Sequence, residues 1–199
     1  MRNGLNKKKK VISSGVDAIS VALARVINRL NYLDYRIGDL ESYTHITPSQ
    51  AFLAVFGGPI TAHRVASNNC ECWAQNMGNN KINFYNTISP AQVISHPLLI
   101  VHEIGHTFDA RSGLDANSVI PNNLLRPTNS DGIIGTQGRS NFGYFGPHFD
   151  WQFGKDASNR QGEEFADMFV GWVYNRWEGS ALGNQRRDFM NALMVTYLP

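Results

Sequence analysis

Two histidines and a glutamate at residues 102–106 have the types and spacing needed to hold and use a metal ion. The stretch reads HEIGH, so His102, Glu103 and His106 form the pattern H-E-x-x-H. Residues four apart on a helix project from the same face, and one ion can therefore bind both imidazoles. Glu103 lies about 100° round the helix from His102, where its carboxylate could reach a water on the metal without being a ligand. The expected metal is zinc (Zn2+), with Glu103 as general base.

The sequence around this motif has the features of a helix that is buried on one side. Ser89 and Pro90 are suited to the N-cap and first turn, and Pro97 could restart the helix just before the motif. Gly105 lowers helix propensity by roughly 1 kcal/mol relative to alanine, so we expect another segment to pass close to it. The apolar residues lie away from the histidines: Leu98, Val101, Ile104 and Phe108.

A catalytic zinc site needs a third protein ligand, and a second predicted helix supplies the best candidates. Ser158 and Gln161 form a capping box at its start. Glu163 is the predicted ligand, and Glu164 is the alternative if the helix is rotated. Asp167, one turn later, is suited to accept a hydrogen bond from a ligand histidine. These carboxylates could instead be a solvated acidic helix start, which the helix dipole favours. The apolar stripe of this helix consists of Phe165, Met168, Phe169, Trp172 and Val173.

The combination of HEIGH with a downstream EEFAD resembles the gluzincin metallopeptidases, and among them the lethal-factor-like catalytic domain. In gluzincins the H-E-x-x-H pattern supplies two zinc ligands and a downstream glutamate supplies the third. The resemblance therefore implies that His102, His106 and Glu163 bind zinc, that the fold is zincin-like and that peptide bonds are hydrolysed. It covers residues 97–173. Further matches to the family pattern are Gly105, Asp109, Gly113, Phe165 and Ala166.

The sequence departs from the family at the residue expected to stabilise the transition state. The family carries a tyrosine about two turns before the third ligand, whereas this chain has Asp156 there. Tyr144 or His148, in the aromatic stretch before it, could donate the missing hydrogen bond to the oxyanion. The alternative interpretation is that the side chains of Tyr144 and His148 only pack within the loop. A metzincin site is not expected, because Ser112 stands where the third histidine of that group would be.

The remaining chain predicts a basic tail at residues 1–12 and one domain at residues 13–199. Residues 1–10 hold five of the 18 Lys and Arg residues, which leaves residues 11–199 with 13 basic and 16 acidic residues. We expect a flexible tail and no nucleic-acid partner. Ser13, Ser14 and Asp17 interrupt the apolar part of a possible secretory signal, so cleavage is not expected. No stretch approaches 18 apolar residues, so no transmembrane segment is expected.

Hydrophobic periodicity predicts an α+β architecture for this domain. A long amphipathic helix is expected over residues 14–40, and a closing helix over about 183–197. Residues 60–87 contain short extended segments that predict a small, mostly antiparallel sheet. Resemblance to zincins implies that one of these segments, KINFYN, is the edge strand to which an extended substrate adds. Residues 112–157 are predicted to form a long loop that walls the substrate cleft.

Cys70 and Cys72 are the only cysteines, and they are too close in sequence for an unstrained disulfide, so free thiols are expected.

The metal motif and the predicted fold together indicate a zinc-dependent metalloendopeptidase that acts on peptide or protein substrates. Two alternatives stay open. One is a zincin-derived module that keeps zinc and binds a protein partner without cleaving it. The other is a metal-free domain in which His102, His106 and Glu163 form a buried polar network.

Overall fold

The structure is a computed structural model that describes residues 2–38, 42, 44–65, 74–85, 97–126, 128, 130, 131 and 160–199. Several sequence predictions lie outside these residues: those for Tyr144, His148, Asp156, the two cysteines, the Ser89 and Ser158 caps and most of the long loop. The described part is helix-rich, with one small sheet, and is α+β as predicted.

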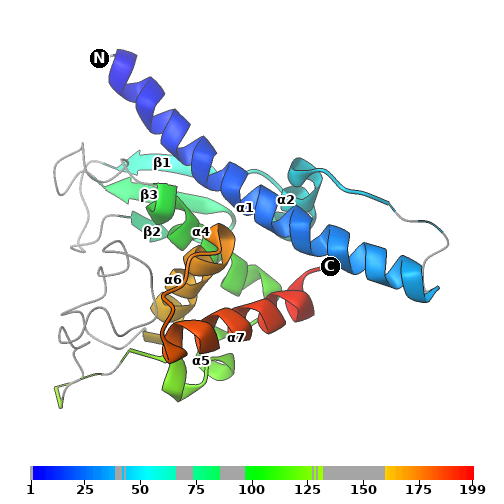
Figure 1. The fold of residues 1–199 in the computed structure, drawn as a ribbon. Helices are drawn as coiled ribbons and strands as arrows, with labels where there is room; N and C mark the ends of the chain where they lie inside the picture. The colour runs from blue at the N-terminus through cyan, green and yellow to red at the C-terminus, as the bar shows by residue number, and fades with distance from the viewer. Residues whose placement is uncertain are drawn as a thin grey trace.

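Helix α1 (Arg2–Ile37) runs along the whole length of the molecule (Figure 1). It begins earlier than predicted, because residues 2–12, expected to be a flexible tail, continue the helix without interruption. Ile19, Leu23 and Ile27 are buried, and α1 packs against helices α2, α4 and α6. Gly15 permits a close approach, since a Cβ atom there would lie only 2.8 Å from the Cβ of Ile100 in α4.

The apolar part of α1 is long and hydrophobic enough to cross a membrane by length and composition. This part is Lys9–Asp34, with a mean hydropathy of 1.4 over its 18-residue window. The sequence predicted no transmembrane segment, because no stretch approaches 18 continuous apolar residues. Of the window, 39% is buried inside the domain, and core helices of soluble proteins and signal sequences share the same length and composition.

The sheet contains β1 (Thr61–Val65), β2 (Ala74–Asn76) and β3 (Lys81–Tyr85) in the order β1-β3-β2. β2 and β3 are antiparallel, whereas β1 and β3 are parallel, with Thr61 opposite Lys81. The predicted mostly antiparallel sheet is therefore wrong for one of the two pairs. The choice of KINFYN as edge strand is also wrong, because β3 is the central strand.

A tight turn explains why β3 is central. Gly78, Asn79 and Asn80 all have positive φ, at 73°, 49° and 59°. Glycine and asparagine adopt this conformation more readily than other residues. The turn reverses the chain and fixes β2 beside β3, which leaves the other edge of β3 for β1. Among the described strands, β2 is the edge strand that contacts α4.

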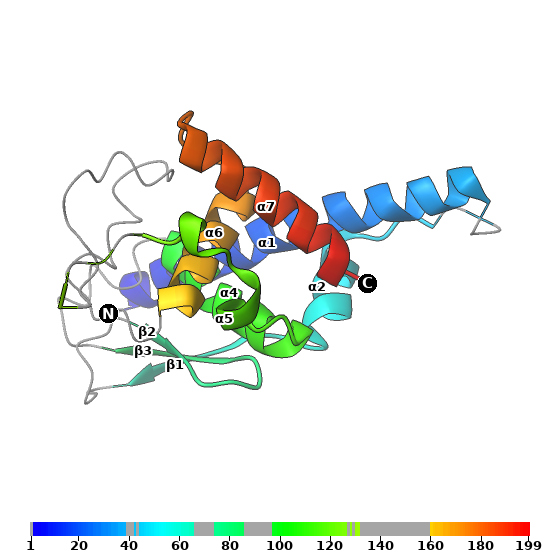
Figure 2. The same ribbon diagram turned by 90° about the horizontal axis from the view of Figure 1, so that it is seen from below.

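The helices that carry the predicted metal residues lie in the middle of the molecule. α4 (Pro97–Ser112) is followed by α5 (Ala116–Val119) and the 3-10 turn η1 (Asn122–Leu124), and α6 (Arg160–Tyr174) by α7 (Ala181–Tyr197). Figures 1 and 2 show the sheet on one side of α4 and α6, and α7 on the other. The short helix α2 (Pro48–Phe56) begins with the capping box of Thr47 and Gln50 and ends at Gly57.

An aromatic cluster holds the backs of α4 and α6 together. Phe108 of α4 stacks on Phe165 and Phe169 of α6, with ring centroids 6.2 and 5.5 Å apart, and contacts Phe56 of α2 edge-on at 6.4 Å. Such pairs contribute about 0.5–1.5 kcal/mol each beyond the area they bury. This packing fixes the position of α4 relative to α6, and with it the faces that carry the predicted metal residues.

Candidate metal centre

Helix α4 places His102 and His106 on one face, one turn apart, as the sequence predicted. Their ring centroids are 4.9 Å apart and the ring planes are nearly perpendicular, at 88°. His102 is buried and His106 is partly exposed. Because the aromatic cluster and α1 cover the back of α4, the two imidazoles are displayed from a helix that is supported on its other sides.

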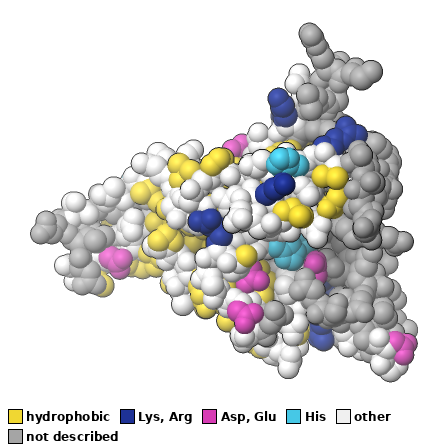
Figure 3. Space-filling model, turned by 180° about the vertical axis from the view of Figure 1, so that it is seen from behind, with side chains coloured by type: hydrophobic (Ala, Val, Ile, Leu, Met, Phe, Trp, Pro, Cys, Tyr) yellow, Lys and Arg dark blue, Asp and Glu magenta, His cyan; other side chains and the backbone are white. Residues whose placement is uncertain are grey.

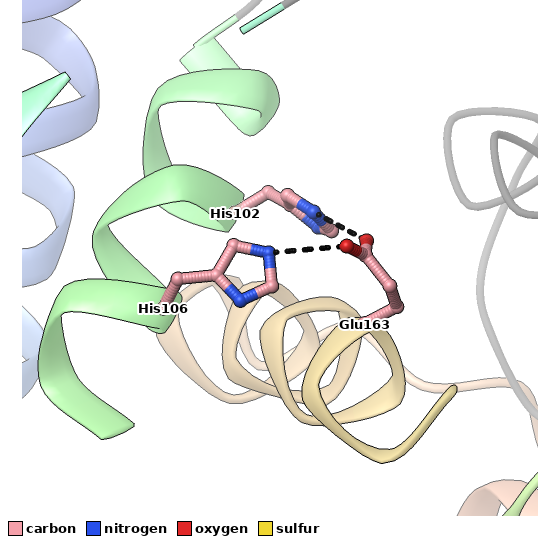
Figure 4. Close-up of side chains that lie close together, drawn as sticks. All are labelled: His102, His106 and Glu163. Atoms are coloured by element: carbon pink, nitrogen blue, oxygen red, sulfur yellow. Dashed lines mark ion pairs between the residues drawn. The ribbon is translucent and has the colours of Figure 1, made fainter. Parts of the chain in front are cut away.

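Helix α6 brings Glu163 to the same two rings (Figure 4). Its Oε2 lies 3.2 Å from Nε2 of His102, and its Oε1 lies 3.6 Å from Nε2 of His106. The candidate ligand atoms of the three residues all lie within 4.8 Å of one another. In tetrahedral zinc sites the ligand atoms are roughly 3.4 Å apart, given bonds of about 2.1 Å. The three side chains therefore have a spacing that fits one zinc ion.

Glu164, the alternative ligand, points elsewhere. It is fully buried, its Oε1 accepts a hydrogen bond from the backbone N–H of Arg126 at 2.9 Å, and its Oε2 lies 3.3 Å from Nη2 of Arg186. Consecutive helical residues differ by about 100° in direction, so only one of the two glutamates can face the histidines. In this structure it is Glu163.

Asp167 contacts His102 on the ring nitrogen that faces away from the cluster. Nδ1 of His102 lies 2.8 Å from Oδ1 of Asp167. An ionised carboxylate can only accept, so Nδ1 carries the proton and donates it. This bond orients the ring with Nε2 toward Glu163, which is the arrangement typical of metal-binding histidines. The hydrogen bond between Asp167 and a histidine of the motif, which the sequence predicted, is present in the structure.

Glu103 is buried beside the cluster, and burial raises its pKa to about 7, with a further increase from Glu163 and an opposing effect from His102. A carboxyl group with such a pKa can take up and release protons near neutral pH. Its backbone carbonyl accepts a hydrogen bond from Nδ2 of Asn76 at 3.1 Å, and the same amide group donates to Thr107 at 2.6 Å. Strand β2 is thus attached to α4 next to Glu103.

The two histidines have opposite pKa shifts. Burial lowers the pKa of His106 to about 4, assisted by the charge of His102, so His106 is neutral and can donate an electron pair. Burial also disfavours the charged form of His102, but hydrogen bonds to Asp167 and Glu163 outweigh it and raise its pKa well above 6.5. The raised pKa favours the form of His102 that carries a proton on both ring nitrogens when no metal is bound.

This protonation makes zinc binding depend on pH. A zinc ion that binds Nε2 of His102 would displace the proton there, so we expect protons to be released when zinc binds. Zinc affinity should therefore increase from pH 6 to pH 7. Calorimetry in two buffers with different ionisation enthalpies measures the proton count. An affinity that stays constant across this range would contradict the protonation states described for the metal-free protein.

Gly105 lies where α4 and α6 touch, as its place in the helix predicted. A Cβ atom there would come within 3.1 Å of Cα of Ala166 and 3.3 Å of Phe169. The absence of a side chain at 105 and the small side chain at 166 let the two helices approach closely. The distance between the histidines and Glu163 depends on this approach.

Replacement of Gly105 by alanine should therefore destabilise the protein. Alanine gains about 1 kcal/mol of helix propensity, but overpacking against a backbone atom typically costs about 1–3 kcal/mol, so we expect a small net loss. Zinc affinity should also fall, because the helices must move apart. Denaturant unfolding and zinc titration measure the two effects. Gly179→Ala, between α6 and α7, is the control for a glycine substitution without a clash, since a Cβ atom at 179 meets nothing within 4 Å. Equal behaviour of the two variants would contradict this account.

Sequence reasoning missed two residues next to the site, Arg126 and Arg186. Both are fully buried and bind the carboxylates of α6. Arginine is rarely buried without a partner. In the sequence, the partners of Arg126 lie 38 or more residues away from it, and those of Arg186 lie 22 or more residues away. No local pattern identifies such pairs.

Comparison of the chain with protein-family models, with curated proteins and with solved structures finds no match.

Proposed function

We propose that this protein is a zinc-dependent metalloendopeptidase with a zincin-like fold. The observation that carries the proposal is the convergence of two imidazoles from α4 and a carboxylate from α6, with all candidate ligand atoms within 4.8 Å. Two histidines and one glutamate are the protein ligands of several catalytic zinc hydrolases, in which a fourth position is left for water. The donor set therefore fits zinc, and it fits a catalytic site better than a structural one, which uses four protein ligands.

Glu103 supports a hydrolytic role over simple metal binding. Zinc bound at such a site supplies a Lewis acid, which lowers the pKa of a coordinated water and polarises a carbonyl group. Glu103 then accepts a proton from the attacking water as the water oxygen bonds to the scissile carbonyl carbon. It returns that proton to the amine nitrogen as the C–N bond breaks. One water is consumed and Glu103 ends as it began.

The remaining residues hold this arrangement in place. His102, His106 and Glu163 would bind the ion, and Asp167 orients His102 through Nδ1. The site is open to solvent, because the side chains of His106 and Glu163 are 19% and 28% exposed. Figure 3 shows one face of the molecule, on which two histidine side chains reach the surface, the lower one close to acidic side chains. A peptide could therefore approach the ion from outside.

A peptide library tests the proposal. The protein is purified, loaded with one equivalent of zinc and incubated with a mixture of synthetic peptides, whose new ends are identified by mass spectrometry. We expect cleavage at defined bonds that a chelator abolishes and added zinc restores. The His106→Ala variant, purified and treated with zinc in the same way, serves as the control for contaminating peptidases. Tight zinc binding without cleavage of any peptide would instead favour a zinc-containing binding module.

A further inference from the structure

We propose that Arg126 is a positioning residue of the metal centre: it holds Asp167 in the orientation in which Asp167 fixes the ring of His102. The proposal rests on the proposed zinc site for its functional meaning, although the contacts themselves need no metal. Arg126 follows η1, in the part of the chain between the two metal helices, and its side chain is fully buried.

The contacts of Arg126 attach it to one face of α6. Its Nη2 donates to Oδ2 of Asp167, its Nη1 lies 3.3 Å from Oε1 of Glu164, and its backbone N–H donates to the same Oε1 at 2.9 Å. Glu164 and Asp167 are three residues apart and therefore neighbours on the helix surface. The guanidinium fork thus binds two carboxylates at once, and the backbone contact keeps its own position fixed.

Asp167 divides its two oxygens between the two neighbours. Oδ1 accepts from Nδ1 of His102 and Oδ2 accepts from Arg126. Because Asp167 is fully buried, no water can replace a lost partner easily, and its carboxylate plane is set by both contacts together. Loss of Arg126 would leave the carboxylate free to turn toward another donor, and the ring of His102 would lose its fixed orientation.

Arg186 provides a comparison within the same network. It is also fully buried, and its guanidinium binds the backbone carbonyl of Leu124 and Oε2 of Glu164. These contacts with Leu124 and Glu164 are separate from the hydrogen bond that joins Asp167 to His102. Substitution of either arginine removes one buried cation beside Glu164. Only substitution of Arg126 should disturb the hydrogen bond to the metal-binding histidine.

The test compares zinc affinity in two matched pairs, Arg126→Met with Arg186→Met and Arg126→Lys with Arg186→Lys. Competition with a chromophoric chelator should show a 10–100-fold weaker affinity in Arg126→Met, which is the usual effect of losing a contact behind a metal ligand. Arg186→Met should stay within about twofold of wild type. Asp167→Asn should weaken zinc affinity as much as Arg126→Met does. The double variant that combines Arg126→Met with Asp167→Asn should have an affinity no weaker than that of either single variant. If Arg126→Met does not fold, the lysine pair decides, because lysine keeps the charge but cannot bind both carboxylates.

A metal-free readout separates this proposal from the proposed function. In chelated wild-type protein, the buried Nδ1 proton of His102 should give a slowly exchanging downfield proton resonance. The resonance should disappear in Arg126→Met or Arg126→Lys and persist in the matching Arg186 variants. Persistence in all four, with zinc affinities within twofold of one another, would overturn the proposal. A wild-type protein that binds no zinc would refute the proposed function, and the resonance would still decide the role of Arg126.

Discussion

Replacement of Glu103 by glutamine should reduce peptide hydrolysis by roughly 10³-fold while leaving the zinc content unchanged, since general bases typically contribute 10²–10⁴-fold. Glutamine has nearly the same shape but cannot take the proton from water. Zinc binding should persist because Glu103 is not among the residues that surround the candidate ion position. The relevant measurements are the initial rate on a cleaved peptide from the library and the metal content of the same sample.

The effect of Glu103→Gln must be separated from a general loss of negative charge. Asp188→Asn is the matched control, because Asp188 is exposed at the surface of α7, where it forms an ion pair with Arg187. This variant should keep wild-type rates. If Glu103→Gln still cleaved peptide at a rate within tenfold of wild type, Glu103 would not be the general base. Loss of zinc together with activity would instead assign Glu103 a role in binding the metal.

Replacement of Glu164 by alanine should destabilise the protein by about 3–5 kcal/mol, the usual cost of removing one partner from a buried ion pair. Glu164 contacts both buried arginines, Arg126 and Arg186. Its loss would leave two guanidinium groups without one of their carboxylates in an environment that excludes water. Urea unfolding in the presence of a chelator measures this effect without a contribution from the metal.

The neighbouring glutamate should behave in the opposite way. Glu163→Ala, at a partly exposed position, should change the stability of the chelated protein little and should lose zinc binding. Glu164→Gln is the milder companion of Glu164→Ala, because it keeps an acceptor for the backbone N–H of Arg126. A chelated Glu164→Ala protein as stable as wild type would contradict the assigned network. So would strong destabilisation by Glu163→Ala alone.

Local spacing was sufficient to predict the parts of the site that lie on helices. The four-residue interval of His102 and His106 fixes their common face. The apolar stripe of α6 favoured Glu163 and Asp167 for the opposite face, with Glu164 left as the alternative ligand. Gly105 also indicated the helix contact, because a glycine inside a helix has a cost that close packing explains. These features depend on residues within two turns of one another.

Features that depend on distant pairing were not predictable in the same way. The β2–β3 turn leaves one edge of β3 free for β1, but strand periodicity does not encode whether β1 pairs there in the parallel or the antiparallel direction. No local pattern marked Arg126 and Arg186 as buried, since their partners are on α6 and η1. The start of α1 was placed too late, because a lysine run suggests a solvated tail although lysine is a good helix former.

The zinc content of protein purified without added metal tests the central claim most directly. Wild type and Glu163→Ala should be prepared side by side, with Glu164→Gln as a third sample, and measured by elemental mass spectrometry. We expect about one equivalent of zinc in wild type and in Glu164→Gln, and far less in Glu163→Ala, as a three-ligand site requires. No zinc in any sample, even after incubation with zinc, would contradict the account and leave the three side chains as a buried polar network. Equal zinc in all three would show that Glu163 is not a ligand.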